Sequence, residues 1–485
     1  MMEGQLQGRK QMHQKVSGAT GVGNLRILSG LLIGVFHIMP GQVWAQQASL
    51  PPSATAPASE VQATTVPVAD TRTSQERAVA LDSTYGLKGW NIAWPSFGES
   101  LTQDNGYWRS KLAEYGVSFL MYDLVSSAVN MLNMPSSNRG EQAYWGQSPS
   151  VAHTNVAYLQ YDLSRWGIPN GQLQVAGQIA QSTWQPYSPN VASLYRLAYY
   201  QTFLNKTLEF NAGYMSAATA FVGNFVAGQI QNPFGPSASI PVEVGFSQSV
   251  AVQPMAWAKY HVGNFYEMFG VARSVQPVAG AVYADSQINP TQARFTEPGA
   301  NVLYANEIGY KTIASGESMG TWVRAGGIYN TSNYHNYATN GESTNYGLYL
   351  LVDRQLMQIH NGNRGIYAGF SAMYAPPATN VYSKYFEGRI YGIGLFDARP
   401  RDTITFVWAH NGVSRYYANA INDKSSITKT FAAYGANSYT ASYNMRVTRG
   451  AYMTLGLQYT DRPSVSYIPS EGHSLNFLAS TFIVF

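Results

Sequence analysis

The last residues of the chain alternate in a way that suits a strand with two different faces. From Leu475 to Phe485 every second side chain is compatible with hydrocarbon: Leu475, Phe477, Ala479, Thr481, Ile483 and Phe485. Because successive side chains of a strand point to opposite faces, this row predicts a lipid-facing surface over about eleven residues, the length of a tilted membrane strand. A buried last strand of a soluble β protein is the alternative that this segment alone leaves open.

The other end of the chain favours export. Four basic residues precede a mostly apolar stretch of thirteen residues from Ile27 to Met39, and an A-x-A-like site ends at Ala45. The basic residues are Arg9, Lys10, Lys15 and Arg26. The apolar stretch is too short to span a bilayer as a helix. We therefore expect residues 1–45 to be a signal peptide that is cleaved near Ala45.

Composition argues against helical membrane spans and against a nucleic-acid partner. Charged residues make up only 12% of the chain, yet no stretch after the leader holds eighteen consecutive apolar residues. Removing the leader takes away four of thirty Lys and Arg and one of twenty-six acidic residues, which leaves 26 minus 25, a net charge of +1. Binding of nucleic acid would need a one-signed excess. Neutral solutes fit this charge better.

The absence of cysteine requires another source of stability. The chain has 45 Gly and 35 Tyr residues but no Cys, so neither disulfides nor cysteine-based metal sites can form. A closed barrel supplies stability without either, since every strand is paired on both sides. Strands with one lipid face, one water face and aromatic girdles produce this composition. We expect no metal and no cofactor.

The first part of the exported chain differs from the rest. Residues 46–89 are rich in Ala, Pro, Ser and Thr, and we expect a flexible periplasmic linker, because they bury too little apolar surface to offset the entropy of ordering. Residues 90–115 predict a short segment at the periplasmic mouth, with a helix over 105–115 that Gly116 ends. Residues 116–485 remain for the barrel domain.

Alternating segments recur from Gly116 to the end of the chain, and they predict an all-β fold: a transmembrane antiparallel β-barrel of about sixteen strands. The predicted strands lie near 116–132, 155–163, 172–180, 193–204, 208–214, 247–261, 264–275, 301–312, 319–331, 344–354, 364–375, 386–397, 401–410, 438–449, 451–462 and 473–485. Pro254 inside one of them is a fault in this scheme unless it lies at a bulge.

The predicted connections alternate between long and short, as expected for long extracellular loops and short periplasmic turns. An even strand count with both termini in the periplasm follows from this alternation. The long connections are 133–152, 184–192, 217–246, 276–300, 332–343, 376–385, 411–437 and 463–472, and the short ones 167–171, 205–206, 262–263, 313–318, 355–363, 398–400 and Gly450.

Sixteen strands leave a water-filled lumen, so function depends on its narrowest point. The longest connection, 217–246, is the candidate for a loop folded into the channel, with an ordinary extracellular loop as the alternative. Its candidate constriction residues are Phe221, Asn224, Phe225, Gln229, Asn232 and Phe234.

The order of several loose motifs resembles the carbohydrate-selective porin family of Gram-negative outer membranes (OprB type). They are the exported leader and linker, the Trp108-Arg109 to Leu112 to Gly116 entry into the first strand, the Asn232-Pro233-Phe234-Gly235 loop and the terminal Phe485, which resembles the assembly signal of such barrels. The resemblance covers roughly residues 90–485. It implies a sixteen-stranded monomer barrel through which sugars diffuse passively.

Sugar passage requires charged or amide groups beside aromatic surfaces, with binding weak enough for release. Both charge signs occur on the row expected to face the lumen, and the alternative is that these side chains form salt bridges that hold the wall. The expected channel-lining residues are Asp123, Gln160, Asp162, Gln174, Gln178, Arg196, Glu209, Asn211, Glu307, Arg324, Asp353, Arg389, Asn444 and Arg446.

Other functions fit the sequence less well. It contains no HExxH, GxSxG or Walker motif, so we expect no enzyme, although some outer-membrane barrels are hydrolases. A structural anchor would need a smaller barrel or a folded extra domain, and a general ion-conducting porin is the main alternative. The expected partners are permeating sugars, outer-membrane lipid and lipopolysaccharide, and the assembly machinery. Monomer and homo-trimer both remain open.

Overall fold

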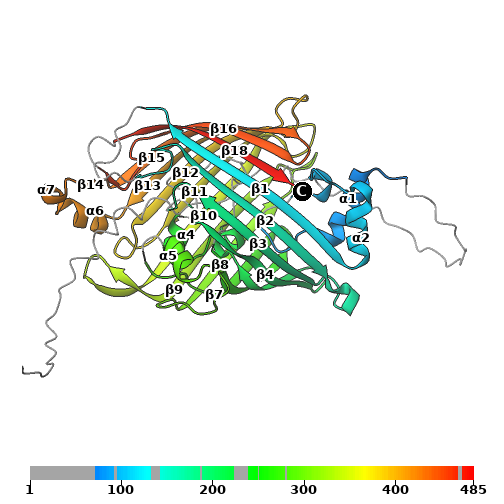
Figure 1. The fold of residues 1–485 in the computed structure, drawn as a ribbon, viewed down its shortest axis with the longest axis horizontal. Helices are drawn as coiled ribbons and strands as arrows, with labels where there is room; N and C mark the ends of the chain where they lie inside the picture. Colours follow the sequence, from blue (N-terminus) through cyan, green and yellow to red (C-terminus); the bar gives the residue numbers. More distant parts are fainter. Residues whose placement is uncertain are drawn as a thin grey trace, which may run out of the picture.

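The computed structural model describes residues 71–91, 95–132, 142–185, 188–222, 239–248, 251–278, 281–467 and 472–485. Sixteen antiparallel strands form one closed barrel, in which β1 pairs with β2 on one side and with the last strand, β18, on the other. Figure 1 shows the strands crossing the barrel obliquely. The fold class predicted from the alternating segments is confirmed.

The barrel strands are β1 (Val117–Asn130), β2 (Ser150–Asp162), β3 (Gln172–Ser182), β4 (Val191–Phe203), β5 (Leu208–Met215), β6 (Gln253–Val262), β7 (Phe265–Arg273), β8 (Val302–Thr312), β9 (Thr321–Asn336), β10 (Gly341–Ile359), β11 (Arg364–Tyr374), β12 (Tyr382–Ile393), β13 (Thr403–Val413), β15 (Gly435–Thr448), β16 (Ala451–Thr460) and β18 (Ser474–Val484). Each predicted strand corresponds to one of them.

Alternation along each strand separates an outer row from an inner row. Leu159 and Ile179 on the outer row are 52% and 51% exposed, whereas Gln160 and Gln178 on the inner row are 2% and 4% exposed. The outer row of β18 carries the predicted apolar residues, so the last strand has the expected orientation. Phe485 continues this edge, and its backbone N–H donates to Met121 O at 2.8 Å.

Two details of the predicted strand pattern are wrong. The connection expected over 332–343 contains only residues 337–340, because β9 and β10 continue past the barrel rim as a hairpin with polar side chains. The predicted strand 247–261 begins only at Gln253, so Pro254 is the second residue of β6 and pairs with Tyr214. At the start of a strand, Pro removes little of the backbone hydrogen bonding between neighbouring strands.

The end of the barrel that carries the long connections bears small additional elements. They are α5 (Ala281–Ile288), α6 (Arg415–Asn422), α7 (Ser425–Thr428) and a two-stranded sheet of β14 (Phe431–Ala432) and β17 (Ser466–Tyr467). Figure 1 shows α6, α7 and β14 at this end, opposite the C-terminus. Within the described part of the chain, no helix has the length and apolar character needed to cross a membrane.

The opposite end carries the N-terminal helices, where the linker prediction is wrong from residue 74 onward. α1 (Ser74–Tyr85) begins with a capping box between Thr73 and Glu76. η1 (Phe97–Glu99), η2 (Asn105–Tyr107) and α2 (Trp108–Glu114) follow, and η3 (Leu163–Trp166) lies in the turn after β2. Gly116, at φ 75°, ends α2 as predicted. Residues 1–70, with the predicted signal peptide, lie outside the described residues.

Candidate functional site

The inner rows of the strands gather nearly all the polar residues that the sequence analysis selected. The residues on these rows are Gln160, Asp162, Gln174, Gln178, Arg196, Glu209, Asn211, Glu307, Arg324, Asp353, Arg389, Asn444 and Arg446. Some of these side chains make structural contacts: Asp162 caps η3, and Arg446 pairs with Glu99 of η1 at 3.0 Å.

Asp123 faces the opposite way from the prediction. It pairs in register with Ile483 and Asn155, on the outer row, while its neighbours Tyr122 and Leu124 are buried on the inner row. Its carboxylate is hydrogen-bonded to Nε2 of His153 on the same outer surface. The prediction assumed a polar inner face, whereas the inner face of β1 is apolar.

Glu307 of β8 is the centre of one cluster in the lumen. Its carboxylate accepts hydrogen bonds from the hydroxyls of Tyr266 and Tyr349, both at 2.7 Å, and Trp322 Nε1 donates to the Tyr266 hydroxyl at 3.2 Å. All four side chains lie on inner rows and are buried. The phenols therefore hold the carboxylate in a fixed position between aromatic rings.

Arg324 joins this cluster to the base of the long connection. Its guanidinium lies 3.7 Å from the centre of the Trp322 ring, a cation–π contact. Nη1 donates to the carbonyl of Phe221, at 3.4 Å, and to that of Val222. Nε and Nη2 have no protein partner among the described residues. Both nitrogens are buried, as is the whole Arg324 side chain, which is only 1% exposed.

The connection between β5 and β6 enters the lumen at both of its ends. It begins with α3 (Ala217–Ala220), and Phe221 packs on Phe246 with ring centres 5.7 Å apart. In α4 (Ser239–Glu243), the Glu243 carboxylate accepts from the backbone N–H groups of Val381 and Tyr382 at 2.8 and 2.9 Å. Burial raises the pKa of Glu243 to about 8.

Of the predicted constriction residues, only Phe221 is described, and it is fully buried. The remaining candidates lie outside the described residues: Asn224, Phe225, Gln229, Asn232 and Phe234.

A second cluster surrounds Arg389 of β12. Its guanidinium donates to both oxygens of Asp353, at 2.9 and 2.6 Å, and to Glu387 Oε1 at 2.8 Å. Tyr391 donates to Asp353 at 3.1 Å and stacks on Tyr367, with ring centres 5.0 Å apart. Two acids around one Arg leave the cluster with net negative charge when both are ionised.

Some polar and aromatic lumen residues were missed by the sequence analysis. Lys259 donates to Asn91 Oδ1 at 2.7 Å, and Lys311 lies 4.5 Å from the Trp322 ring centre. Lys259 and Trp257 share the inner row of β6, two positions apart. No group of His, Asp and Glu able to hold a metal ion occurs in the part of the chain that the structure describes.

Comparison with known proteins decides the family. The model of the carbohydrate-selective porin family, OprB type, matches residues 141–472. The chain belongs to this family of carbohydrate-selective outer-membrane porins. Family and fold together are those of a channel rather than an enzyme.

Solved structures support the fold of this porin. The high-pH structure of Pseudomonas putida OprB is 16% identical, and the match covers 80% of this chain and 98% of that one with a TM-score of 0.64. The low-pH structure is 15% identical and covers 81% and 100%, with a TM-score of 0.50. A comparison with curated protein sequences gives no significant match.

We predict that Arg389→Ala destabilises the barrel by about 3–5 kcal/mol, because two buried carboxylates lose their shared cation. The temperature at which the folded band disappears in a semi-native gel measures this. Arg354→Ala is the matched control, since Arg354 lies exposed on the outer row of β10. Equal unfolding temperatures for Arg389→Ala and the wild type would contradict the prediction.

Proposed function

We propose that this porin lets mono- and small oligosaccharides diffuse passively across the outer membrane. The observation that carries the proposal is the cluster of Arg324, Glu307 and Trp322, which sets a guanidinium beside a fixed carboxylate and aromatic rings on the inner wall. Sugar hydroxyls need such donors and acceptors, and sugar C–H faces suit aromatic surfaces. The mixed charge favours neutral solutes over one class of ion.

We expect sugars to block the ionic current of single channels in a dose-dependent manner, and Arg324→Ala to weaken this block roughly tenfold, since a hydrogen bond to a charged group contributes about 1.5–3 kcal/mol. Conductance of the refolded protein in a planar bilayer, with sugars titrated in, is the measurement. Arg324→Lys, which keeps the charge without the planar fork, separates charge from geometry. A current that every sugar leaves unchanged would favour a general ion-conducting porin.

We further propose that the connection 217–246 narrows the channel. Support comes from its described ends: Arg324 holds the carbonyl groups at its start, and Glu243 is bound to the backbone at the start of β12. A connection fixed inside the lumen at both ends reduces the open cross-section.

Shortening residues 224–236 is expected to raise single-channel conductance, because it removes chain from between two lumen-bound ends. Deleting residues 423–428, around the exposed helix α7, provides a control at the same end of the barrel. The loop is not part of the constriction if the shortened variant conducts like the wild type.

We also propose that the outer face of β1 and β2 is a contact between copies of the chain in a homo-trimer. Asp123, His153 and Asn155 lie on the outer row, with Asp123 near the middle of β1. Ionisable groups are costly in lipid, and small neighbours such as Ala157 and Gly177 permit close approach.

We predict that Asp123→Leu with His153→Leu shifts the porin toward the monomer in cross-linking experiments in detergent. Glu267→Leu with Asn306→Leu is the matched control, because it removes a second outer polar pair, 3.0 Å apart, on β7 and β8. A wild-type protein that is already monomeric at all concentrations would refute the contact.

The proposal extends to export and to assembly in the outer membrane. We infer that residues 1–45 are removed during export, that Phe485 is read by the outer-membrane assembly machinery, and that the outer row contacts lipid and lipopolysaccharide. The apolar outer row of β18 and the position of Phe485 beside β1 support this. Replacement of Phe485 by a polar residue would test the assembly role.

A further inference from the structure

One part of the inner wall is apolar, which is unexpected for a water-filled lumen. Leu120, Tyr122 and Leu124 occupy the inner row of β1, and Tyr158 of β2 and Phe482 of β18 continue the same surface. None of the five is more than 5% exposed. Side chains of this kind stay buried only if other apolar groups cover them, since exposure costs about 25 cal/mol for each Å².

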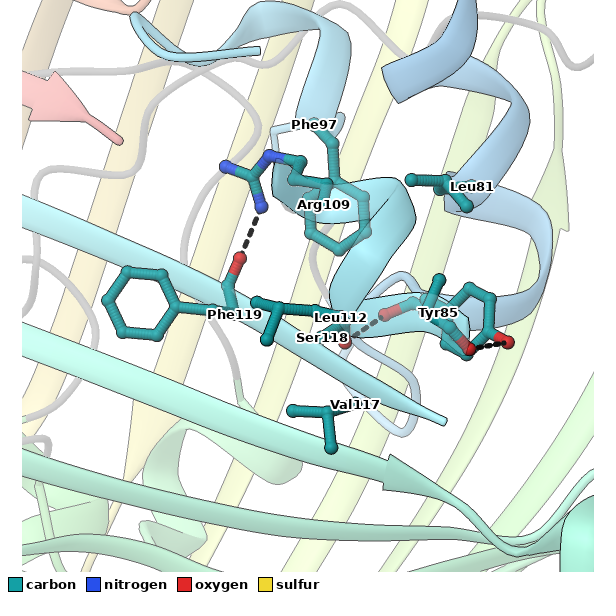
Figure 2. A pocket seen from close by; sticks show the side chains of 9 residues that line it. Leu81, Tyr85, Phe97, Arg109, Leu112, Val117, Ser118 and Phe119 are labelled. Atoms are coloured by element: carbon teal, nitrogen blue, oxygen red, sulfur yellow. Dashed lines mark hydrogen bonds between the residues drawn. The ribbon is translucent and has the colours of Figure 1, made fainter. Parts of the chain in front are cut away.

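The cover comes from the N-terminal segment. Ala78 of α1 and Phe97 of η1 belong to the same apolar cluster, and Tyr85, Leu87 and Trp90 pack against it. In Figure 2, Leu81 and Phe97 lie beside the start of β1, and Arg109 donates a hydrogen bond to the carbonyl of Phe119. The first helices are therefore docked on the barrel rather than tethered beside it.

Beyond α1 the chain enters the barrel. We call residues Gly86–Asn91 the N-terminal insert. Gln172 Nε2 donates to Gly86 O at 3.1 Å, and Gln174 Nε2 donates to Lys88 O at 2.9 Å. Both glutamines lie on the inner row of β3. The backbone of the insert thus runs along the inside of the wall.

The tip of the insert reaches the base of the long connection. Arg196 lies 4.4 Å from the centre of the Trp90 ring. The Asn91 side chain accepts from Lys259 Nζ at 2.7 Å and donates to Phe221 O at 3.1 Å. Asn91 is only 6% exposed. Side chains of β4 and β6 and the start of the connection therefore enclose the end of the insert.

The chain on the far side of the insert is also fixed to the barrel. Glu99 of η1 pairs with Arg401 at 2.9 Å and with Arg446 at 3.0 Å, and Leu101 N–H donates to Val484 O at 2.8 Å. The chain before and after the insert is anchored to the barrel, so these flanking contacts, as well as those of the insert itself, fix its position inside the lumen. The family match, residues 141–472, does not include this segment.

We propose that the N-terminal insert is a second constriction element, which fills the β2–β6 side of the lumen from the short-turn end and confines permeating solutes to the opposite wall. The size limit of the pore is then set jointly by the insert and by the connection 217–246. This inference rests on the proposed channel function.

Gly89→Ala tests the insert with a minimal change. Gly89 has φ +76°, and a Cβ there would lie 2.5 Å from Asn211 Nδ2 and 2.6 Å from a carbon of the Tyr200 ring, so the contact between the insert and the wall must open. Gly106→Ala is the matched control, because Gly106 has φ +63° in the same N-terminal segment but nothing within 4 Å of a Cβ. We expect conductance to rise in Gly89→Ala and to stay at the wild-type value in Gly106→Ala.

A truncated mature protein that begins at Pro95 removes the insert and keeps the flank with Glu99. We expect its conductance to rise, and oligosaccharides above the size limit of the wild type to enter liposomes that contain the truncated protein. Gel mobility must show that the truncated protein and Gly89→Ala are folded. If both variants then have the conductance and the size limit of a conducting wild type, the inference about the insert is overturned, but the channel function stands. A wild-type barrel that does not conduct overturns both.

Discussion

The requirement that every backbone amide and carbonyl be paired in hydrocarbon governs this structure. Closure of β1 against β18 meets it, and the N–H of Phe485 extends the same ladder to Met121 at the end of the chain. Closure also fixes the register, so that each strand has one row toward lipid and one toward the lumen. The positions of Arg324, Glu307 and Arg389 follow from that register, and the chemistry of the lumen is a consequence of how the barrel closes.

The inner wall is divided into regions of different chemistry. On β8 to β12 it carries charged residues held by tyrosines, as around Glu307 and Arg389, and these groups suit polar solutes. A patch on β1, β2 and β18, which includes Leu120, Tyr158 and Phe482, is apolar and is covered by the N-terminal helices and the insert. An apolar wall needs permanent cover, whereas a polar wall can be wetted. Water and solutes therefore have one favourable side of the lumen to follow.

Local alternation was enough to predict sixteen strands and the faces of most polar residues, because the inner and outer environments differ along each strand. It failed for Asp123, since the sequence of β1 does not show that residues about forty positions earlier cover its inner face. The helix α1 was missed because its Ala- and Ser-rich composition resembles the linker before it, although Thr73 and Glu76 carry a capping-box signal. Cover by distant segments is a tertiary property that periodicity does not record.

The two elements that enter the lumen meet at the backbone carbonyls of Ala220 and Phe221, to both of which Asn91 Nδ2 donates. The carbonyl of Phe221 accepts from Asn91 Nδ2 of the insert and from Arg324 Nη1 of the wall, at 3.1 and 3.4 Å. A displacement of the insert would leave this carbonyl with one donor and would free Lys259, which now binds Asn91. Because buried polar groups are costly without partners, the base of the connection would then shift toward Arg324 or toward water. The insert and the base of the connection therefore share hydrogen-bond partners, and we expect a displacement of one to move the other.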